Sequence, residues 1–143
     1  MGGKAARIKG HAFERAVAKD IRKVFGMSSD EIKRGLQSRN NQDKVPDVIC
    51  PGFSIECKRY AKNPPIGKAF KQAKEVAGKK IPVAITKADH EDALATIPYT
   101  LFIVFLTEFV ERYGNKLDDI IAMAIAVTAT ELKTKDDKGK TDT

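Results

Sequence analysis

The chain has 143 residues, which is enough for one compact domain with a single hydrophobic core. Its 26 Lys and Arg residues outnumber 19 Asp and Glu residues, and the formal net charge of +7 favours a polyanionic partner such as DNA, RNA or an anionic surface. The longest apolar run, residues 101–106, is too short to span a bilayer, and no secretory signal pattern is found at the N-terminus. We therefore expect a cytoplasmic protein with no membrane association.

The first predicted element is an amphipathic helix over roughly residues 10–25. Phe13, Val17 and Ile21 recur at helical spacing, and Gly26 is a typical helix stop. Glu14 lies at the margin of this apolar stripe, where a carboxylate is either a solvated rim residue or reaches a cation at a sheet edge. Periodicity alone favours the solvated rim.

An extended segment over residues 32–37 and a polar loop over 38–44 come next, followed by a predicted β-hairpin. Pro51 and Gly52 separate two β-prone runs, 45–50 and 53–59, the second of which alternates cleanly between two faces. The two cysteines of the chain fall in these runs and are expected to be free thiols in strands.

A two-residue hairpin loop would place Asp47 directly opposite Glu56, on the face that also carries Lys58. Like charges at such a position destabilise a sheet, by about 1 kcal/mol at most. The pair therefore calls for a compensating cation. Mg²⁺ is commonly held by one or two carboxylates together with substrate phosphate. Lys58 would then hold or help to deprotonate a water beside a scissile phosphate, and the chemistry expected is metal-assisted hydrolysis.

The second half of the chain begins with a helix whose expected cap is Asn63 and whose expected stop is Gly78. Two strands are predicted over residues 81–86 and 99–106, the latter apolar enough for a sheet that is covered on both faces. The fold expected from this order is α/β or α+β, a sandwich around one mixed sheet.

The C-terminal part is predicted to contain a short helix over residues 108–113 and a longer one from about 117 to 133, which could serve dimerisation or packing. Residues 134–143 are polar, have no hydrophobic anchor, and are expected to be disordered. The expected division is thus a catalytic core over 1–114, a C-terminal helix over 115–133 and a tail over 134–143.

Several motifs together resemble the PD-(D/E)XK nuclease superfamily, and within it the archaeal-type Holliday junction resolvases. The resemblance covers about residues 7–106. It rests on Lys9-Gly10 and Phe13-Glu14-Arg15 in the first helix, Arg34 ahead of a polar loop, Pro46-Asp47, Ile55-Glu56-Cys57-Lys58, and the segment from Pro82-Val83 to Lys87.

The resemblance implies a restriction-endonuclease-like fold, with a central mixed five-stranded sheet flanked by helices. It implies that Asp47, Glu56 and the Cys57 backbone carbonyl bind Mg²⁺, with Mn²⁺ as a substitute, and that Lys58 serves the nucleophilic water. It also implies that Glu14 completes the acidic site, against the rim interpretation.

Further candidates flank this site. Ser38 lies at the position of a catalytic serine in the family, and Gln72 is either a site residue or a surface residue of a basic helix. The expected phosphate contacts are Arg34, Arg39, Arg59, Lys62 and Lys68.

The resemblance implies a homodimer that makes paired, symmetric nicks in a four-way DNA junction. Two alternatives remain open at this stage. One is a nuclease of the same chemistry with another target, such as a restriction-like, repair or replication enzyme. The other is a non-catalytic nucleic-acid-binding module, against which the converging carboxylates argue because they would repel phosphate.

Overall fold

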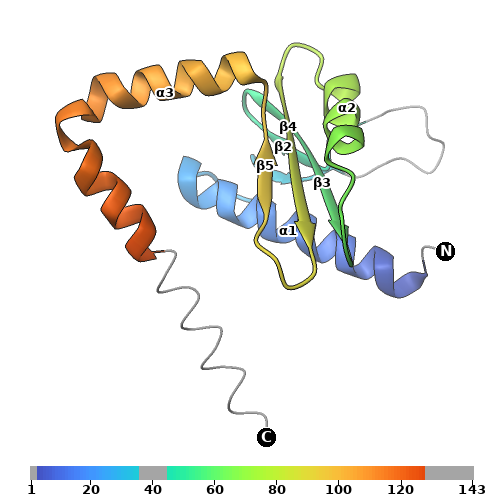
Figure 1. Ribbon diagram of the computed structural model, residues 1–143. Helices are drawn as coiled ribbons and strands as arrows, with labels where there is room; N and C mark the ends of the chain where they lie inside the picture. The colour runs from blue at the N-terminus through green and yellow to red at the C-terminus, as the bar shows by residue number, and fades with distance from the viewer. Residues whose placement is uncertain (1–2, 36–44, 128–143) are drawn as a thin grey trace, which may run out of the picture. The chain divides into compact units, whose positions relative to one another are not determined.

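Figure 1 shows the structure, a computed structural model that describes residues 3–35 and 45–127. Two compact units are present, Met1–Pro98 and Tyr99–Thr143, called here the N-terminal and the C-terminal unit. The boundary follows Pro98, whereas the sequence suggested a core extending to residue 114. Each unit is described by itself.

The N-terminal unit opens with α1 (Lys4–Phe25), which ends where Gly26 takes the left-handed conformation at φ 62°. The helix begins about six residues earlier than predicted. Its first turns contain strong helix formers but are exposed, so no apolar periodicity could reveal them. Phe13 and Ala18 are the buried residues of α1.

The sheet of this unit has five strands in the order β1-β2-β3-β4-β5. They are β1 (Lys33–Arg34), β2 (Val48–Cys50), β3 (Phe53–Tyr60), β4 (Ile81–Ala88) and β5 (Leu94–Thr96). Only the β3 and β4 pair is parallel, and the other neighbours are antiparallel. The expected α+β fold of restriction-endonuclease-like type, a mixed five-stranded sheet flanked by helices, is confirmed.

The hairpin between β2 and β3 has the predicted register. Cys50 pairs with Phe53, and Val48 pairs with Ile55. Gly52 has a φ of 79°, which suits the third position of a type II turn with proline before it. The register, and with it the position of Asp47 just before β2, follows from this two-residue connection.

The parallel strands β3 and β4 are joined through α2 (Ile66–Val76), which is shorter than predicted at both ends. Asn63 has a positive φ of 46° and does not cap the helix, because α2 begins at Ile66 and Pro65 takes the N-cap position. Ala69 and Ala73 are fully buried, and these small side chains let α2 lie close to β3 and β4.

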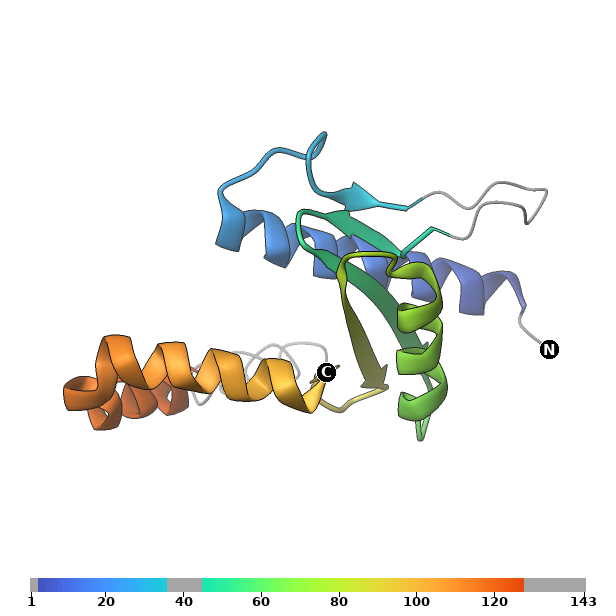
Figure 2. The same cartoon turned by 90° about the horizontal axis from the view of Figure 1, so that it is seen from above.

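The two helices cover opposite faces of the sheet (Figures 1 and 2). Alternation along the strands separates the faces: Ile55 and Val83 belong to the main core beneath α1, whereas Glu56 and Ala84 face α2. The main core consists of Phe13, Ala18, Ile32, Val48, Cys50, Ile55, Cys57 and Val83. The α2 face is the one that carries the predicted catalytic side chains.

The C-terminal unit contains α3 (Tyr99–Tyr113), a 3-10 turn (Gly114–Lys116) and a helical segment over residues 117–127. The strand predicted over 99–106 is therefore wrong: this run forms a helix, and the fifth strand lies just before it. None of the residues of α3 is buried. The tail predicted over 134–143 lies outside the described residues.

In the two described stretches, 3–35 and 45–127, none of the helices has both the length and the hydropathy that a membrane span requires.

Candidate active site

The site begins where β2 and β3 part at the open end of the hairpin. Asp47 directly precedes β2, is 9% exposed, and accepts a hydrogen bond at Oδ2 from the Cys57 backbone N–H at 2.8 Å. A side chain thus replaces the backbone acceptor that a longer β2 would supply. The hydrogen bond fixes one carboxylate oxygen, Oδ2, and the Asp47 side chain also lies within hydrogen-bonding reach of the Glu56 carboxyl group.

Glu56 lies on the adjacent strand and is 6% exposed. Burial raises the pKa of its carboxyl group, and the negative charge of Asp47 raises it further. The opposing effect comes from Lys58, whose Nζ donates a hydrogen bond to Glu56 Oε1 at 2.6 Å. In this structure Lys58 therefore provides the cation that two neighbouring buried carboxylates require.

Lys58 is held in its charged form by the same contact. Burial by itself lowers the pKa of a lysine, but the hydrogen bond and the charges of Glu56 and Asp47 outweigh that effect, so the pKa of Lys58 is raised. Lys58 in this arrangement is a hydrogen-bond donor whose charged form is favoured by the two carboxylates.

The Cys57 side chain points away from this chemistry. It belongs to the main core under α1, and burial raises the pKa of its thiol well above the ordinary value. Cys50 is also buried, and both cysteines are free, as predicted. Only the backbone of Cys57 faces the site. In an extended strand the N–H and C=O of one residue lie at the same edge, so the carbonyl is expected on the Asp47 side.

Glu14 and Arg34 form an ion pair between α1 and β1, with 14% and 25% of their side chains exposed. The sequence placed Glu14 in the acidic site and Arg34 among the phosphate contacts. The structure brings the two together instead, with the Arg34 guanidinium on the Glu14 carboxylate. Glu14 is still close enough to Cys57 for its charge to raise the pKa of that thiol.

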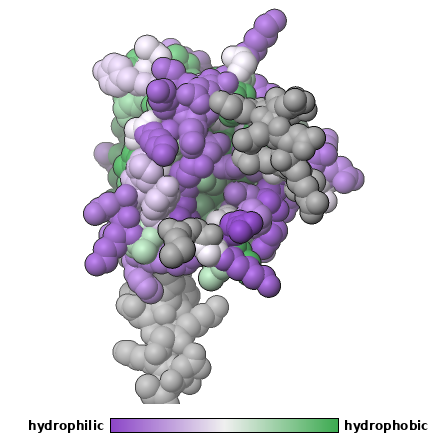
Figure 3. Space-filling model, turned by 90° about the vertical axis from the view of Figure 1, so that its right-hand side faces the viewer, coloured by the Kyte–Doolittle hydropathy of each residue, from purple (hydrophilic) through white to green (hydrophobic). Residues whose placement is uncertain are grey.

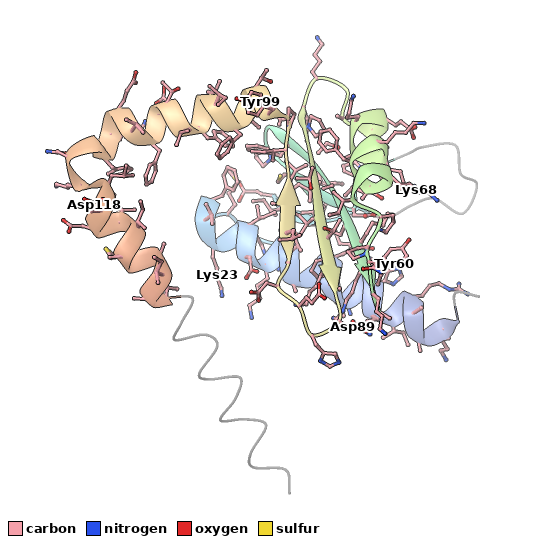
Figure 4. All side chains as sticks on the ribbon, viewed as in Figure 1. Lys23, Tyr60, Lys68, Asp89, Tyr99 and Asp118 are labelled. Atoms are coloured by element: carbon pink, nitrogen blue, oxygen red, sulfur yellow. The ribbon has the colours of Figure 1, made fainter. Side chains whose placement is uncertain are left out.

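Arg59, another predicted phosphate contact, donates a hydrogen bond to Asp89 Oδ1 at 3.1 Å. Asp89 follows β4 and also pairs with Lys9 of α1, which lowers the pKa of the Asp89 carboxyl group. Its backbone N–H donates to the Tyr60 carbonyl at 3.0 Å, and Figure 4 labels both residues. No local pattern in the sequence points to this acidic partner, because it lies 30 positions from Arg59.

The remaining candidates are placed as follows. Lys62 is exposed in the connection after β3, and Lys68 is exposed on α2, where Figure 4 labels it. Gln72 lies on α2 with its Oε1 atom buried and without a hydrogen-bond partner. Ser38 and Arg39 lie outside the described residues.

The donor set fits a hard divalent cation. Among the described residues, no three His, Cys, Asp or Glu side chains gather closely enough to bind one ion together. Asp47 and Glu56 offer two buried carboxylates on neighbouring segments, and burial with the nearby charge of Asp47 raises the pKa of the Glu56 carboxyl group, which marks unfavourable negative charge there. Two carboxylates with a backbone carbonyl and waters are ordinary ligands of Mg²⁺, which rarely has a cage made by protein alone.

Fold and site together define a protein of the PD-(D/E)XK nuclease class: a mixed sheet on which a Pro-Asp segment meets a Glu-x-Lys strand. A family model described as "Phage putative PDDEXK endonuclease" matches residues 5–138. The chain belongs to this family of phage endonucleases. No curated protein and no solved structure matches it significantly.

Proposed function

We propose that the chain is a Mg²⁺-dependent DNA endonuclease that cuts branched DNA, with the four-way junction as its preferred substrate and a homodimer as its working form. The observation that carries the nuclease assignment is the buried pair of carboxylates, Asp47 and Glu56, with the Lys58 ammonium group hydrogen-bonded to Glu56. Family membership supports the endonuclease class, and the junction preference goes beyond it.

The residues of the chain would divide the reaction as follows. Asp47, Glu56 and the Cys57 carbonyl would hold Mg²⁺, or Mn²⁺ in its place. The bound ion supplies Lewis-acid activation of water and neutralises charge on the phosphate. Lys58 would donate hydrogen bonds to the attacking water and to a phosphate oxygen. Glu14, held by Arg34, would add negative charge at the edge of the site.

The DNA would approach over α2. Figure 3 views the molecule from the side on which α2 lies, and hydrophilic side chains dominate this face. Lys68, Lys71 and Lys74 are exposed on α2, and Lys62 is exposed just before it. These lysines lie on or just before the helix that covers the sheet face of Glu56 and Lys58, so they can bind phosphates beside the scissile one.

The homodimer is proposed from the C-terminal unit. Five consecutive apolar residues of α3, 102–106, are each at least 40% exposed, and no residue of this helix is buried. An apolar stretch of helix that is exposed around its whole circumference requires a partner. A second copy of the same helix would meet this need and would give the two active sites that paired cuts require.

The experiment is a competition between an immobile four-way junction and excess linear duplex of the same sequence, in Mg²⁺, with the cuts mapped on all four strands. Paired cuts on opposed strands near the branch point are expected. Equal cutting of linear duplex at a fixed sequence would replace the junction assignment by a restriction-like one. Binding without cutting in either Mg²⁺ or Mn²⁺ would favour the non-catalytic module.

A further inference from the structure

Three buried polar atoms among the described residues have no hydrogen-bond partner: Ser54 Oγ, Gln72 Oε1 and Thr86 Oγ1. Ser54 and Thr86 are completely buried. Leaving a buried hydroxyl unpaired is unfavourable, and such atoms are rare in folded proteins. All three belong to elements that enclose one space, the layer between α2 and the α2 face of β3 and β4.

Of the three unpaired atoms, Thr86 Oγ1 is the one that lies beside Lys58. The two residues are partners in the parallel register of β3 and β4, so their side chains leave the same face of the sheet. Adjacent strands are about 4.8 Å apart. To contact Glu56, the Lys58 side chain spans two residues of its own strand, about 6.6 Å, which is farther than the distance to the next strand. The Thr86 hydroxyl is therefore within the range of the same long side chain.

The contact between Lys58 and Glu56 competes with any cation at the carboxylate pair. Lys58 Nζ occupies Glu56 Oε1 at 2.6 Å, and Lys58 is half-buried. A divalent ion that binds Glu56 repels the ammonium group and removes its acceptor. A partly buried lysine that loses its hydrogen bond must find another acceptor or destabilise the loaded state.

We propose that Thr86 is the acceptor to which Lys58 moves when a divalent cation binds Asp47 and Glu56. The inference rests on the metal site put forward above. In the metal-free state Lys58 neutralises Glu56 and the Thr86 hydroxyl has no partner. In the loaded state the ammonium group donates to Thr86 Oγ1 beside the metal site. Thr86 is thus a positioning residue, which acts on the reaction only through Lys58.

The test measures Mn²⁺ binding to the full-length protein by calorimetric titration in the absence of DNA. Thr86→Val, which replaces the hydroxyl by a methyl group of similar size, should bind Mn²⁺ about tenfold more weakly, because a hydrogen bond to a charged group is lost only in the loaded state. Thr86→Ser keeps the hydroxyl and should bind like the wild type. The metal-free Thr86→Val protein should melt no lower than the wild type, because its missing hydroxyl has no partner in that state.

A double-mutant cycle separates this role from a structural one. In a Lys58→Met background Thr86→Val should not change Mn²⁺ affinity, because no ammonium group has to move. The matched control is Ser54→Ala, which removes the other fully buried orphan hydroxyl of the same face, opposite Pro82 and away from Lys58. It should leave Mn²⁺ affinity unchanged.

Two results would overturn the role of Thr86 while leaving the metal site intact: wild-type affinity in Thr86→Val, or an equal loss in both Lys58 backgrounds. A different result, Mn²⁺ binding by Asp47→Asn that equals the wild type, would overturn the metal site and this inference with it.

Discussion

The Asp47 carboxylate and the Cys57 backbone N–H are joined by a hydrogen bond of 2.8 Å across the open end of the hairpin. Asp47 therefore has a structural role in pairing β3 and is also a candidate metal ligand. Asp47 Oδ2 completes the pairing of β3 through the Cys57 N–H, and the negative charge of the same carboxylate is what an ion would bind. The two roles can be separated by substitution.

Asp47→Asn should abolish cleavage while keeping the fold, whereas Asp47→Ala should lose both. Asparagine retains an oxygen that can accept from Cys57, but not the charge; cleavage of DNA in Mg²⁺ should fall by about 100-fold or more. Alanine also leaves the Cys57 N–H without an acceptor, which costs about 1–3 kcal/mol in the free energy of unfolding. Urea unfolding and a nicking assay measure the two effects. Normal nicking by Asp47→Asn would remove the proposed site.

The stability of the metal-free protein should depend on pH through Glu56. Its native pKa is raised above the ordinary value of 4.5, so the folded state binds this proton more tightly than the unfolded state. The resulting stabilisation is present below 4.5 and is lost as the pH rises through the raised native pKa.

Glu56→Gln cannot titrate and provides the comparison for this pH dependence. The difference in unfolding free energy, wild type minus Glu56→Gln, should fall with rising pH in urea titrations from about pH 4 to pH 8 without metal. A difference that stays constant over this range would contradict the raised pKa.

Gly35→Ala should destabilise the protein strongly. A Cβ atom at Gly35 would overlap the Pro46 carbonyl oxygen, and the Gly35 N–H donates to the Asp47 carbonyl at 2.8 Å. We expect a loss of about 1–3 kcal/mol in unfolding free energy, together with weaker cleavage, because Asp47 must shift. Gly67→Ala on α2 is the matched control, since open space surrounds it; it should stabilise by about 0.5–1 kcal/mol. Equal effects would show that Gly35 tolerates a side chain.

Replacing Lys68, Lys71 and Lys74 by alanine should lower the affinity for DNA and also make that affinity less dependent on salt concentration. Each lysine that binds a phosphate contributes about 1 to the slope of log affinity against log salt, so the slope should fall by about 3. Binding is measured by fluorescence anisotropy without metal to prevent cutting. The control is Lys23→Ala, which removes an exposed lysine near the C-terminal end of α1 (Figure 4). It should leave the DNA affinity and the salt slope nearly unchanged. An unchanged slope in the triple variant would place the DNA elsewhere.

The wild type should sediment as a dimer at micromolar concentration, and Phe102→Glu with Phe105→Glu should give a monomer. Both phenylalanines are about half exposed on α3, and a charge on each would prevent their burial in an interface. Lys19→Glu on the exposed side of α1 is a charge control that should remain dimeric. A wild-type monomer would contradict the proposed second copy and would favour a contact of α3 within its own chain.

The sequence predicted the β2–β3 hairpin, which carries the candidate site, better than the C-terminal unit, and the reason is physical. The register of Asp47 and Glu56 depends on a two-residue turn, which is local. The run 99–106 carries no period, and an uninterrupted apolar segment fits a buried strand as well as a helix.

The roles of the arginines depended on partners that are distant in the sequence. Arg34 and Arg59 have acidic partners, Glu14 and Asp89, that lie 20 and 30 positions away in the sequence. No local pattern reveals such an ion pair. The same holds for Thr86, whose position beside Lys58 appears only once the parallel register of β3 and β4 is known.

The contact of Gly35 with the Pro46–Asp47 segment has a consequence for engineering. The chain leaves the sheet at Gly35 and returns beside it, so the two ends of residues 36–44 are held together by the fold and not by the length of that connection. Doubling the length of such a connection costs only about 0.6 kcal/mol in closure entropy. We therefore expect that a peptide inserted between Gly35 and Val45 would leave Asp47 in place.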